Sequence, residues 1–398
     1  GLAEVGSVRS EEYAAQILYP ERGISLELIS PREGDPALLG PLEEELSVVF
    51  YSHEPVSWGE TVVFAKETGA PDDSTDATVI LPRSTHEECL GSGICGAVVT
   101  IPAGQPPHGM APGSLYSLCV DTGTERVCRP RSLYRFHETP DPLRVAHLTD
   151  THLGGSEGDS EVEARLHAVL DAVESMDPPV DLVVVTGDIG HKGRAGQIQA
   201  FVDALAKLSC PVITLSGNHD FKEGNIDEYL LRLTPRLNHT SSLGPYLFLA
   251  LDSGPGRYDE EPMTINNQSV GLSSGQVTWL QDELQGLSAR APEAKVVLIH
   301  HPPFAFSWSV LGRRREAFLR TCRRGEVALI LAGHTHINEV YDRLGTSYEL
   351  DPRAGASPSS SRLPLTLITA RSTERRPSFR LLKLRPDGRF TYRFIQVK

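Results

Sequence analysis

The stretch Asp181-Leu-Val-Val-Val-Thr-Gly-Asp188 decides the fold that this sequence predicts. A short, uninterrupted apolar run that is rich in β-branched residues is typical of a strand buried on both faces, as in a parallel sheet. The run ends in Gly187-Asp188, so a carboxylate follows directly on the carboxyl end of the strand. In open α/β sheets this edge is where ligands bind. The stretch therefore predicts an α/β fold with a polar site at one sheet edge.

Four further motifs repeat this pattern of an apolar run that ends in polar residues. They are Asp150-Thr-His152, Gly217-Asn-His-Asp220, His300-His-Pro-Pro303 and Gly333-His-Thr-His336. Together they bring Asp, Asn and His side chains to one place. Mn, Fe and Zn ions accept mixed imidazole and carboxylate ligands, and a carboxylate can bridge two ions. The five motifs therefore predict a hydrolytic site with two metal ions.

The segments between the motifs alternate between strand and helix patterns. Helices with one apolar face are expected at 162–176 and 197–208, and a capping box, Ser273-x-x-Gln276, opens another helix. The tail from 379 to 396 predicts a hairpin around Pro386-Asp-Gly388. The expected strands before the motifs, besides the one already quoted, are 144–148, 211–215, 295–299 and 326–331.

Residues 1–140 have a different pattern, with about seven short strand-like runs spaced by Pro, Gly and Asp. The pattern predicts a small β-sandwich of the immunoglobulin-like kind. The segment His137-Glu-Thr-Pro-Asp-Pro142 reads as a linker, because two prolines resist both helix and central strand. We therefore expect two domains, 1–140 and 141–398.

Four of the six cysteines lie close together, at Cys89, Cys95, Cys119 and Cys128. With no neighbouring pair of histidines they suit disulfides 89–95 and 119–128 better than zinc, and buried thiols are the alternative. Disulfides imply an oxidising compartment or a hyperthermophile. The chain begins at Gly1 rather than Met, which also favours a secreted or extracytoplasmic protein; a cytoplasmic location is the alternative.

The charge is uneven along the chain. Residues 1–140 hold 21 Asp and Glu against 9 Lys and Arg, a balance of −12, and residues 141–398 hold 31 against 29, a balance of −2, which sum to −14. The acidic front half argues against a general nucleic-acid surface, and its simplest role is to keep the protein in solution. No stretch is long and apolar enough to cross a bilayer.

The five motifs in this order resemble the calcineurin-like metallophosphoesterase superfamily over residues 143–384. The resemblance implies a four-layer α/β/β/α sandwich with two metal ions at one edge. One ion would be held by Asp150, His152, Asp188 and His336. The other would be held by Asp188, Asn218, His300 and His334, with Asp188 as the bridge. His219 would protonate the leaving oxygen, and Asp220 would orient His219.

The sequence departs from two branches of that superfamily. The purple acid phosphatases have a metal-binding Tyr where this chain has His191, and they lack the His of the first motif, so a ferric site is disfavoured. The 5′-nucleotidase branch has a large C-terminal domain, whereas 62 residues follow His336 here.

The resemblance implies hydrolysis of a small phosphoester, with in-line attack by a metal-bridging hydroxide. Because a proton donor helps poor leaving groups, we expect a phosphodiesterase. The alternatives are a broad phosphomonoesterase and a non-catalytic, metal-stabilised scaffold. Candidate substrate contacts are His191, His301 and Arg313, for which solvent exposure, plain packing and a solvated helix face are the respective alternatives. The metal, natural substrate and oligomeric state stay open.

Overall fold

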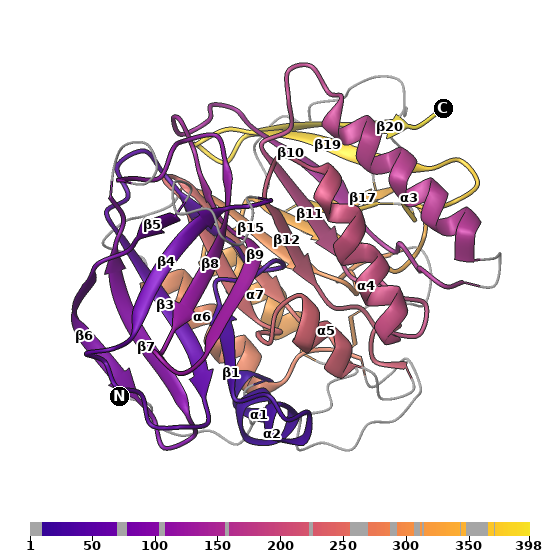
Figure 1. Ribbon diagram of the computed structural model, residues 1–398. Coiled ribbons are helices and arrows are strands. Elements are labelled where there is room, and N and C mark those ends of the chain that lie inside the picture. The colour runs from indigo at the N-terminus through magenta and orange to yellow at the C-terminus, as the bar shows by residue number, and fades with distance from the viewer. Residues whose placement is uncertain are drawn as a thin grey trace.

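The computed structural model describes residues 10–398 except 70–77, 103–107, 156–158, 223–225, 255–269, 287–292, 306–310, 313, 343, 348–364 and 370. Its strands form four sheets (Figure 1). Two sheets belong to the first 135 residues, and two belong to the rest of the chain.

The N-terminal sheets face each other across a shared apolar core. One sheet runs β1 (Leu26–Ser30), β3 (Glu45–Ser52), β7 (Ile94–Thr100) and β6 (Arg83–Cys89). The other runs β2 (Ala37–Leu39), β9 (Arg126–Arg135), β8 (Leu115–Asp121), β4 (Val62–Glu67) and β5 (Thr78–Ile80). Side chains of both sheets, such as Val48 and Leu118, lie in one buried cluster. Two sheets packed face to face in this way are the β-rich arrangement that the sequence predicts.

Each expected disulfide joins two directly opposed residues of neighbouring strands. Cys89 lies opposite Cys95 in β6 and β7, and Cys119 lies opposite Cys128 in β8 and β9. The sequence pattern missed a helical segment before β1, which consists of α1 (Ser10–Tyr13), a π-helical turn (Ala14–Leu18) and α2 (Tyr19–Glu21). This segment was missed because it is short and its buried residues, such as Leu18 and Tyr19, pack on the other half of the chain.

The first sheet of the C-terminal half is mixed. Its order is β12 (Val212–Leu215), β11 (Leu182–Thr186), β10 (Leu143–Leu148), β19 (Ser378–Leu384) and β20 (Phe390–Gln396). The pairs β12–β11 and β11–β10 are parallel, and the C-terminal hairpin adds two antiparallel strands. Apolar side chains of α3 (Asp159–Glu174), α4 (Ala195–Ala204) and α5 (Ile226–Arg232) cover one face, with Leu166 and Phe201 in that core.

The second sheet runs β13 (His239–Leu243), β14 (Tyr246–Leu251), β15 (Ala294–Ile299), β16 (Leu329–Ala332), β18 (Leu365–Ile368) and β17 (Glu339–Tyr341). Leu280 of α6 (Ser274–Gly286) and Phe318 of α7 (Arg315–Arg324) lie in the core on its outer face. The predicted capping box is present, since the Ser273 amide donates to Gln276 Oε1 at 2.9 Å and the Gln276 amide donates to Ser273 Oγ at 3.0 Å.

The two C-terminal sheets pack against each other, and their helices lie on the outside. Val145 and Val184 of the first sheet share a buried cluster with Phe248 and Val296 of the second. Every residue of β11 is buried, as expected for a strand covered on both faces. The expected α/β/β/α layering is therefore the observed one (Figure 1).

The N-terminal half is joined to the rest by buried contacts. Tyr19, Ile29 and Tyr51 belong to the same apolar cluster as Tyr229 of α5. Arg131 Nη1 and Nη2 donate to the carbonyl oxygens of Leu208 and Cys210, each at 2.7 Å. Because one core runs across the junction, the predicted boundary at residue 140 stays a prediction. Among the described residues, none of the helices has the length and apolar character to span a bilayer.

Candidate metal centre

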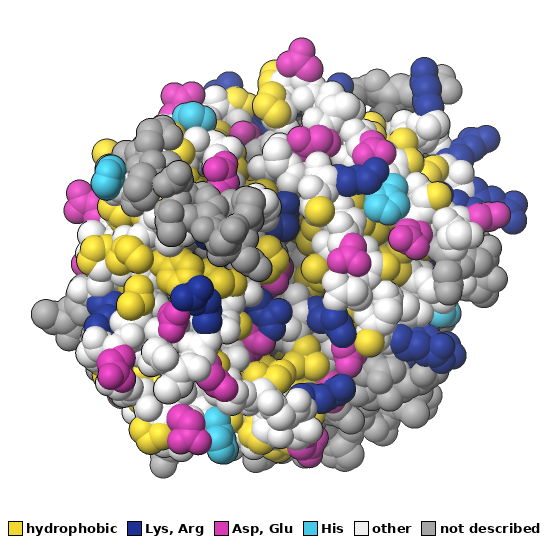
Figure 2. Space-filling model, in the orientation of Figure 1, with side chains coloured by type: hydrophobic (Ala, Val, Ile, Leu, Met, Phe, Trp, Pro, Cys, Tyr) yellow, Lys and Arg dark blue, Asp and Glu magenta, His cyan; other side chains and the backbone are white. Residues whose placement is uncertain are grey.

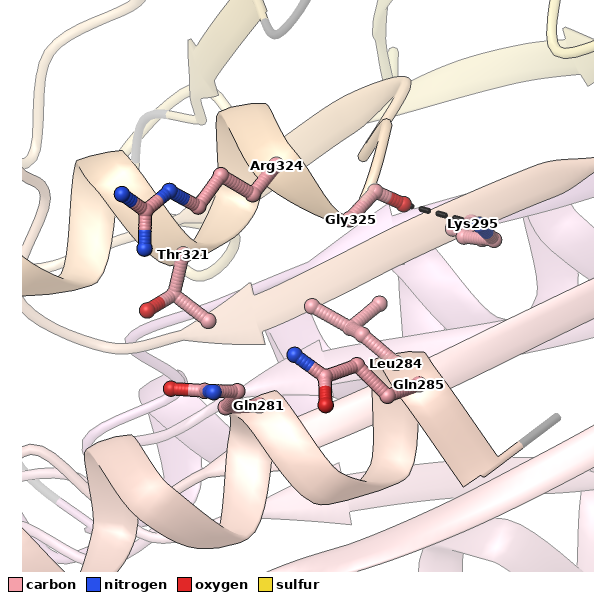
Figure 3. A pocket seen from close by; sticks show the side chains of 7 residues that line it. All are labelled: Gln281, Leu284, Gln285, Lys295, Thr321, Arg324 and Gly325. Atoms are coloured by element: carbon pink, nitrogen blue, oxygen red, sulfur yellow. Dashed lines mark hydrogen bonds between the residues drawn. The ribbon is translucent and has the colours of Figure 1, made fainter. Parts of the chain in front are cut away.

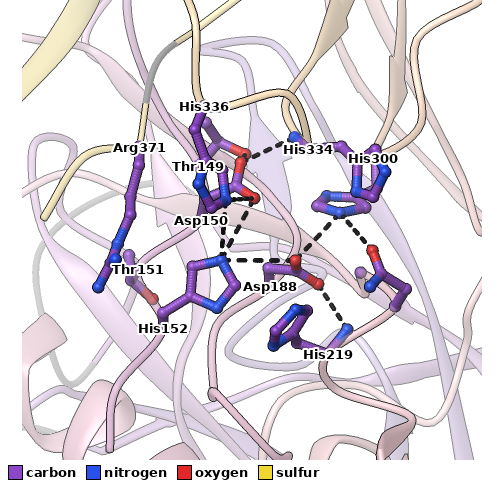
Figure 4. Close-up of polar contacts among 12 residues, drawn as sticks. Thr149, Asp150, Thr151, His152, Asp188, His219, His300, His334, His336 and Arg371 are labelled. Carbon is purple, nitrogen blue, oxygen red and sulfur yellow. Dashed lines mark hydrogen bonds and ion pairs between the residues drawn. The ribbon is translucent and has the colours of Figure 1, made fainter. Parts of the chain in front are cut away.

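The polar side chains of all five motifs lie where strands of the two central sheets end. Asp150 and His152 follow β10, Asp188 follows β11, and Asn218 and His219 follow β12. From the other sheet, His300 and His301 follow β15, and His334 and His336 follow β16. The facing sheets therefore deliver donors from both sides to one edge (Figure 4).

One group of donors gathers around Asp150. Its Oδ1 lies 3.2 Å from His336 Nε2 and 3.6 Å from His152 Nε2. The two Nε2 atoms lie 3.1 Å apart, and His152 Nε2 also lies 3.6 Å from Asp188 Oδ2. Imidazole nitrogens and carboxylate oxygens thus point at a common position.

A second group gathers on the other side of Asp188. Its Oδ2 lies 3.3 Å from His300 Nε2, which is 3.1 Å from Asn218 Oδ1. The His334 ring lies beside the His300 ring, with centroids 5.1 Å apart. Asp188 Oδ2 therefore faces histidines of both groups, which is the position a bridging carboxylate needs.

The hydrogen bonds behind these donors fit a metal better than they fit an empty polar cluster. Thr149 Oγ1 and the His334 amide donate to Asp150 Oδ2, at 2.7 and 2.9 Å, and fix the carboxylate. Its Oδ1 is buried and has no hydrogen-bond partner among the described residues. His300 Nδ1 donates to the Thr186 carbonyl at 2.7 Å, so Nε2 is the nitrogen that would bind a metal ion in the neutral ring. Buried acceptors without donors call for a cation.

The electrostatics of the carboxylates agree with that interpretation. Burial alone would raise the pKa of Asp150 and of Asp188, but contacts with His152, His336 and His300 outweigh burial and hold both pKa values low. Burial would lower the pKa of His300, and the charge of Asp188 raises it to about 10 instead. Two ionised carboxylates in a buried site attract positive charge, which divalent ions would supply.

Several ligand-bearing residues have backbone conformations that L-residues rarely adopt. Asp150, His152, Asp188, His334 and His336 have φ values of 51°, 46°, 53°, 70° and 59°. Such strain gathers at sites where function dictates the geometry. The motif glycines allow the loops to meet: a Cβ on Gly187 would lie 2.7 Å from the Gly217 nitrogen.

The partners of His219 and Asp220 correct one expectation. His219 Nδ1 donates to the His191 carbonyl at 2.8 Å, and the His219 amide donates to Asp188 Oδ1 at 2.7 Å. Asp220 makes no hydrogen bond with the His219 ring. Its carboxylate accepts from the amides of Gly190 and Gly217, both at 2.9 Å, and of Ile189 at 3.3 Å. Asp220 therefore joins two motif loops, and the His191 carbonyl orients His219.

The pKa values of these two residues are shifted by burial. Burial lowers the pKa of His219 to about 4, while the charge of Asp188 and the bond to the His191 carbonyl act in the opposite direction. Burial, followed by the neighbouring charge of Asp188, raises the pKa of Asp220 to about 7.

The structure places the three candidate substrate-binding residues differently. His301 is buried, its Nδ1 lies 2.8 Å from Ser253 Oγ, and its ring lies 4.2 Å from that of His334. It packs behind the donors, which corresponds to the packing alternative. His191 is half-buried, with its ring centroid 5.1 Å from that of His219. Arg313 lies outside the described residues.

Two residues near the centre escaped the sequence analysis. Lys222 Nζ lies 2.8 Å from His219 Nε2, and Arg371 lies beside His152 and Thr151 (Figure 4). Lys222 could have been found from its place two residues after the third motif. Arg371 could not, because it is 35 residues beyond His336 and follows no motif.

A hollow between α6 and α7 lies far from this centre. Its volume is about 100 Å³, and it is lined by Gln281, Leu284, Gln285, Lys295, Thr321, Arg324 and Gly325 (Figure 3). Lys295 is at the start of β15, whereas His300 follows the end of that strand. Five residues of strand place the hollow roughly 16 Å from the metal-site edge.

The comparisons with known proteins agree with the geometry. A family model described as calcineurin-like phosphoesterase matches residues 143–338. A 3′,5′-cyclic-nucleotide phosphodiesterase of Nostoc sp. is 28% identical over 267 residues, or 64% of this chain and 93% of that protein. The 3′,5′-cyclic adenosine monophosphate phosphodiesterase of Escherichia coli is 26% identical, over 63% of this chain and 88% of that protein.

A third relative is a glycerophosphodiester phosphodiesterase of Enterobacter lignolyticus, which is 28% identical over 49% of this chain and 71% of its own length. The matched family segment, residues 143–338, contains every strand end that supplies a donor. Residues 143–338 therefore carry the sequence pattern of the calcineurin-like phosphoesterase family.

Proposed function

We propose that this chain is a metal-dependent phosphodiesterase that holds two divalent cations at the shared edge of its central sheets. The observation that carries the proposal is the pair of donor groups that meet at Asp188 Oδ2, 3.6 Å from His152 Nε2 and 3.3 Å from His300 Nε2. The relatives named as cyclic-nucleotide and glycerophosphodiester phosphodiesterases support it.

The proposed ligands of one ion are Asp150, His152, Asp188 and His336, and those of the other are Asp188, Asn218, His300 and His334. Mn²⁺, Fe²⁺ and Zn²⁺ all accept this mixture of nitrogen and oxygen. When bound, two such ions supply Lewis acidity and a nucleophile at neutral pH. Thr149, the Thr186 carbonyl and the His219 amide hold Asp150, His300 and Asp188 in place through hydrogen bonds.

His219 is the proposed proton donor to the leaving oxygen. Its Nδ1 lies 2.8 Å from the His191 carbonyl, and its Nε2 lies 2.8 Å from Lys222 Nζ, which a substrate would displace to reach Nε2. Its amide contacts Asp188, so the ring is fixed relative to the proposed bridging carboxylate. Burial lowers the pKa of His219 to about 4, and the carbonyl contact opposes that effect, so the contact favours the protonated form that donates.

The test of the reaction class compares two aryl esters with the same leaving group. Purified chain loaded with Mn²⁺, Fe²⁺ or Zn²⁺ should hydrolyse bis(p-nitrophenyl) phosphate with a higher kcat/KM than p-nitrophenyl phosphate. A clear excess on the monoester would favour the phosphomonoesterase alternative. Bound metal with no turnover on either ester would favour the scaffold alternative.

The first mutational prediction concerns the shared carboxylate. Asp188→Asn removes the charge that both ions need, so kcat/KM should fall by about 10³-fold or more and metal content should fall with it. Elemental analysis of the purified variant and the diester assay measure both effects. Asp203→Asn, on the exposed face of α4, is the matched control and should retain metal and activity. Full activity in Asp188→Asn would refute the ligand assignment.

The N-terminal half supports two further proposals. Its two sheets share one core, which supports an immunoglobulin-like sandwich at 1–140 as a separate domain. Its two disulfides support work in an oxidising compartment. Free-thiol titration of the unfolded protein isolated under alkylating conditions tests the second proposal: two thiols, Cys210 and Cys322, are expected, and six would contradict it.

A further inference from the structure

Three basic residues, Lys192, Lys222 and Arg371, lie near the His152, His191 and His219 rings at one side of the metal centre. The His191 ring lies 5.1 Å from the His219 ring and 5.7 Å from the His152 ring, and His191 is only half-buried. Burial is the first cause that lowers the pKa of His191, and the charges of His152, Lys222, Arg371 and Lys192 lower it further. Lys192 is the next residue in the chain, Lys222 Nζ lies 2.8 Å from His219 Nε2, and Arg371 lies beside His152 (Figure 4).

The cations come from separate parts of the chain. Lys192 follows the second motif, Lys222 follows the third, and Arg371 lies between β18 and β19. The chain carries a net charge of −14, so a cluster of three cations is unlike its average composition. Their convergence is a property of the tertiary structure.

Arg371 is fixed in relation to the proposed ligands. Its Nε donates to Thr373 Oγ1 at 3.3 Å, and Thr373 Oγ1 donates at 2.7 Å to the carbonyl of Thr151, between Asp150 and His152. The charge of Arg371 also acts on His336. Within the described part of the chain, no hydrogen bond is formed by its terminal nitrogens. Figure 4 shows the side chain extended past Thr151 beside His152. A guanidinium with two terminal nitrogens to offer can bind a phosphate group through two parallel hydrogen bonds.

A simple phosphodiester does not need these cations. Its scissile phosphate carries one negative charge, which two divalent ions neutralise even when Asp150, Asp188 and a hydroxide are counted with it. Cations beyond the ions become useful when the substrate carries another anionic group beside the scissile one. The half-buried or exposed positions of Lys192, Lys222 and Arg371 leave that side of the centre open to such a group.

We propose that Arg371, with Lys222 and Lys192 nearby, forms a second anion subsite that selects phosphodiesters with a further phosphate on the retained alcohol. The retained side is chosen because Arg371 lies beside His152 and not beside His219, the proposed donor to the leaving oxygen (Figure 4). The inference rests on the proposed phosphodiesterase function and narrows its substrate class. Arg371 supplies the bidentate contact, and the two lysines, which are point charges, supply attraction without fixed geometry.

The experiment compares two substrates that differ only in the additional group. Methyl p-nitrophenyl phosphate and 2-phosphoethyl p-nitrophenyl phosphate both release p-nitrophenolate, so their ratio of kcat/KM reports the retained side alone. The metal-loaded wild type should favour the phosphorylated ester by about tenfold or more. Higher ionic strength should reduce the ratio, because the cations are partly exposed.

Single substitutions test which residues cause the preference for the phosphorylated ester. Arg371→Gln should lower the ratio at least about fivefold, mainly through KM. Arg371→Lys should give an intermediate ratio, because it keeps the positive charge but cannot form two parallel hydrogen bonds. Lys222→Gln should also lower the ratio, which keeps the test available if Arg371→Gln folds poorly. Arg375→Gln removes a charge from the exposed part of the same loop and should leave the ratio unchanged. Thermal melting of each variant separates misfolding from lost recognition.

A wild-type ratio near one would overturn the subsite, and so would an Arg371→Gln ratio equal to that of Arg375→Gln. These outcomes differ from failure of the proposed function. If neither ester released p-nitrophenolate with any of the three metals, the phosphodiesterase proposal itself would fail.

Discussion

At the scale of single residues, the centre depends on strained backbone and on glycines that let loops meet. Five proposed ligands have positive φ values, a conformation that disfavours side chains with a Cβ. Gly187 has a φ of +89° and packs against Gly217. The motif glycines therefore have a steric reason to be present, separate from the chemistry of their neighbours.

The glycine prediction uses a matched pair. Gly187→Ala should lower the free energy of unfolding by about 2 kcal/mol or more, because the new methyl group meets the Gly217 backbone and the φ value is unfavourable. Gly196→Ala places the same group in open space within α4 and should raise stability by about 0.5–1 kcal/mol. Urea unfolding of both variants measures the difference. Equal stabilities would contradict the packing argument.

The prediction for His219 depends on the leaving group. His219→Asn should reduce kcat/KM by about 10²–10⁴-fold for a diester with an alkyl leaving group, which must be protonated. The reduction should be much smaller for p-nitrophenolate, which leaves without help. Rates on a series of diesters of increasing leaving-group pKa measure the slope. The same loss on every member of the series would assign His219 to binding instead.

At the scale of elements, a polar side chain on a buried strand must find its hydrogen-bond partners on neighbouring strands. His147 of β10 is buried, with Nε2 2.8 Å from Thr186 Oγ1 and Nδ1 2.8 Å from Thr369 Oγ1. One ring nitrogen donates and the other accepts, so the ring is neutral. His147 thus links three neighbouring parts of the structure, as expected for a structural histidine.

This environment makes stability depend on pH. Burial, followed by the charge of Arg380, lowers the pKa of His147 to about 3, against about 6.5 in the unfolded chain. Between these values the unfolded state binds the proton and the folded state does not. The contribution of His147 to stability is therefore complete above pH 6.5 and declines by up to about 1.4 kcal/mol per pH unit as the pH falls towards 3.

The measurement is the free energy of unfolding at several pH values between 7 and 4.5. His147→Asn should be less stable than wild type at pH 7, and its stability should fall less steeply with acidification. His108→Asn, at an exposed turn, should follow the wild-type slope. If His147→Asn kept the wild-type slope, the buried neutral ring would not be the source of the dependence.

At the scale of the whole molecule, the N-terminal half and the metal-binding half share an apolar core. The Arg131 guanidinium strengthens that junction with two charged hydrogen bonds to backbone carbonyls. On the face that Figure 2 shows, basic and acidic side chains are interspersed among the coloured residues. That face therefore resembles an ordinary solvated surface more than a nucleic-acid surface.

The junction gives the last prediction. Arg131→Met should lower the free energy of unfolding by about 3 kcal/mol, since two buried carbonyls lose charged donors. Arg126→Met on the same strand removes an exposed ion pair with Asp121 and should change stability by less than about 1 kcal/mol. Urea unfolding followed by far-UV and near-UV circular dichroism measures both. A loss below 1 kcal/mol for Arg131→Met would show that the junction does not depend on this residue.

Much of the fold and of the site could be predicted from local sequence patterns. The run Leu182 to Val185 is buried throughout, and a strand of that kind has a strong pattern because both of its faces are covered. The donors Asp150, His152, Asp188 and His300 could be grouped because parallel strands end at one edge. Boundaries were less accurate: the helix expected at 162–176 is Asp159–Glu174, since charged residues extend a helix without adding apolar periodicity.

The strands, the donor types and the expected pairing of the clustered cysteines could be predicted from the sequence, because each of these depends on residues that are near neighbours in the chain. Two hydrogen-bond arrangements are visible only in the folded structure: Asp220 accepts from the Gly190 amide and so joins two loops, and the His191 carbonyl accepts from the His219 ring. The tertiary structure also decided that Arg371 lies beside His152, and that Tyr19 packs in the same core as Tyr229. These contacts join residues far apart in the chain, and a local pattern carries no information about which distant surfaces will meet.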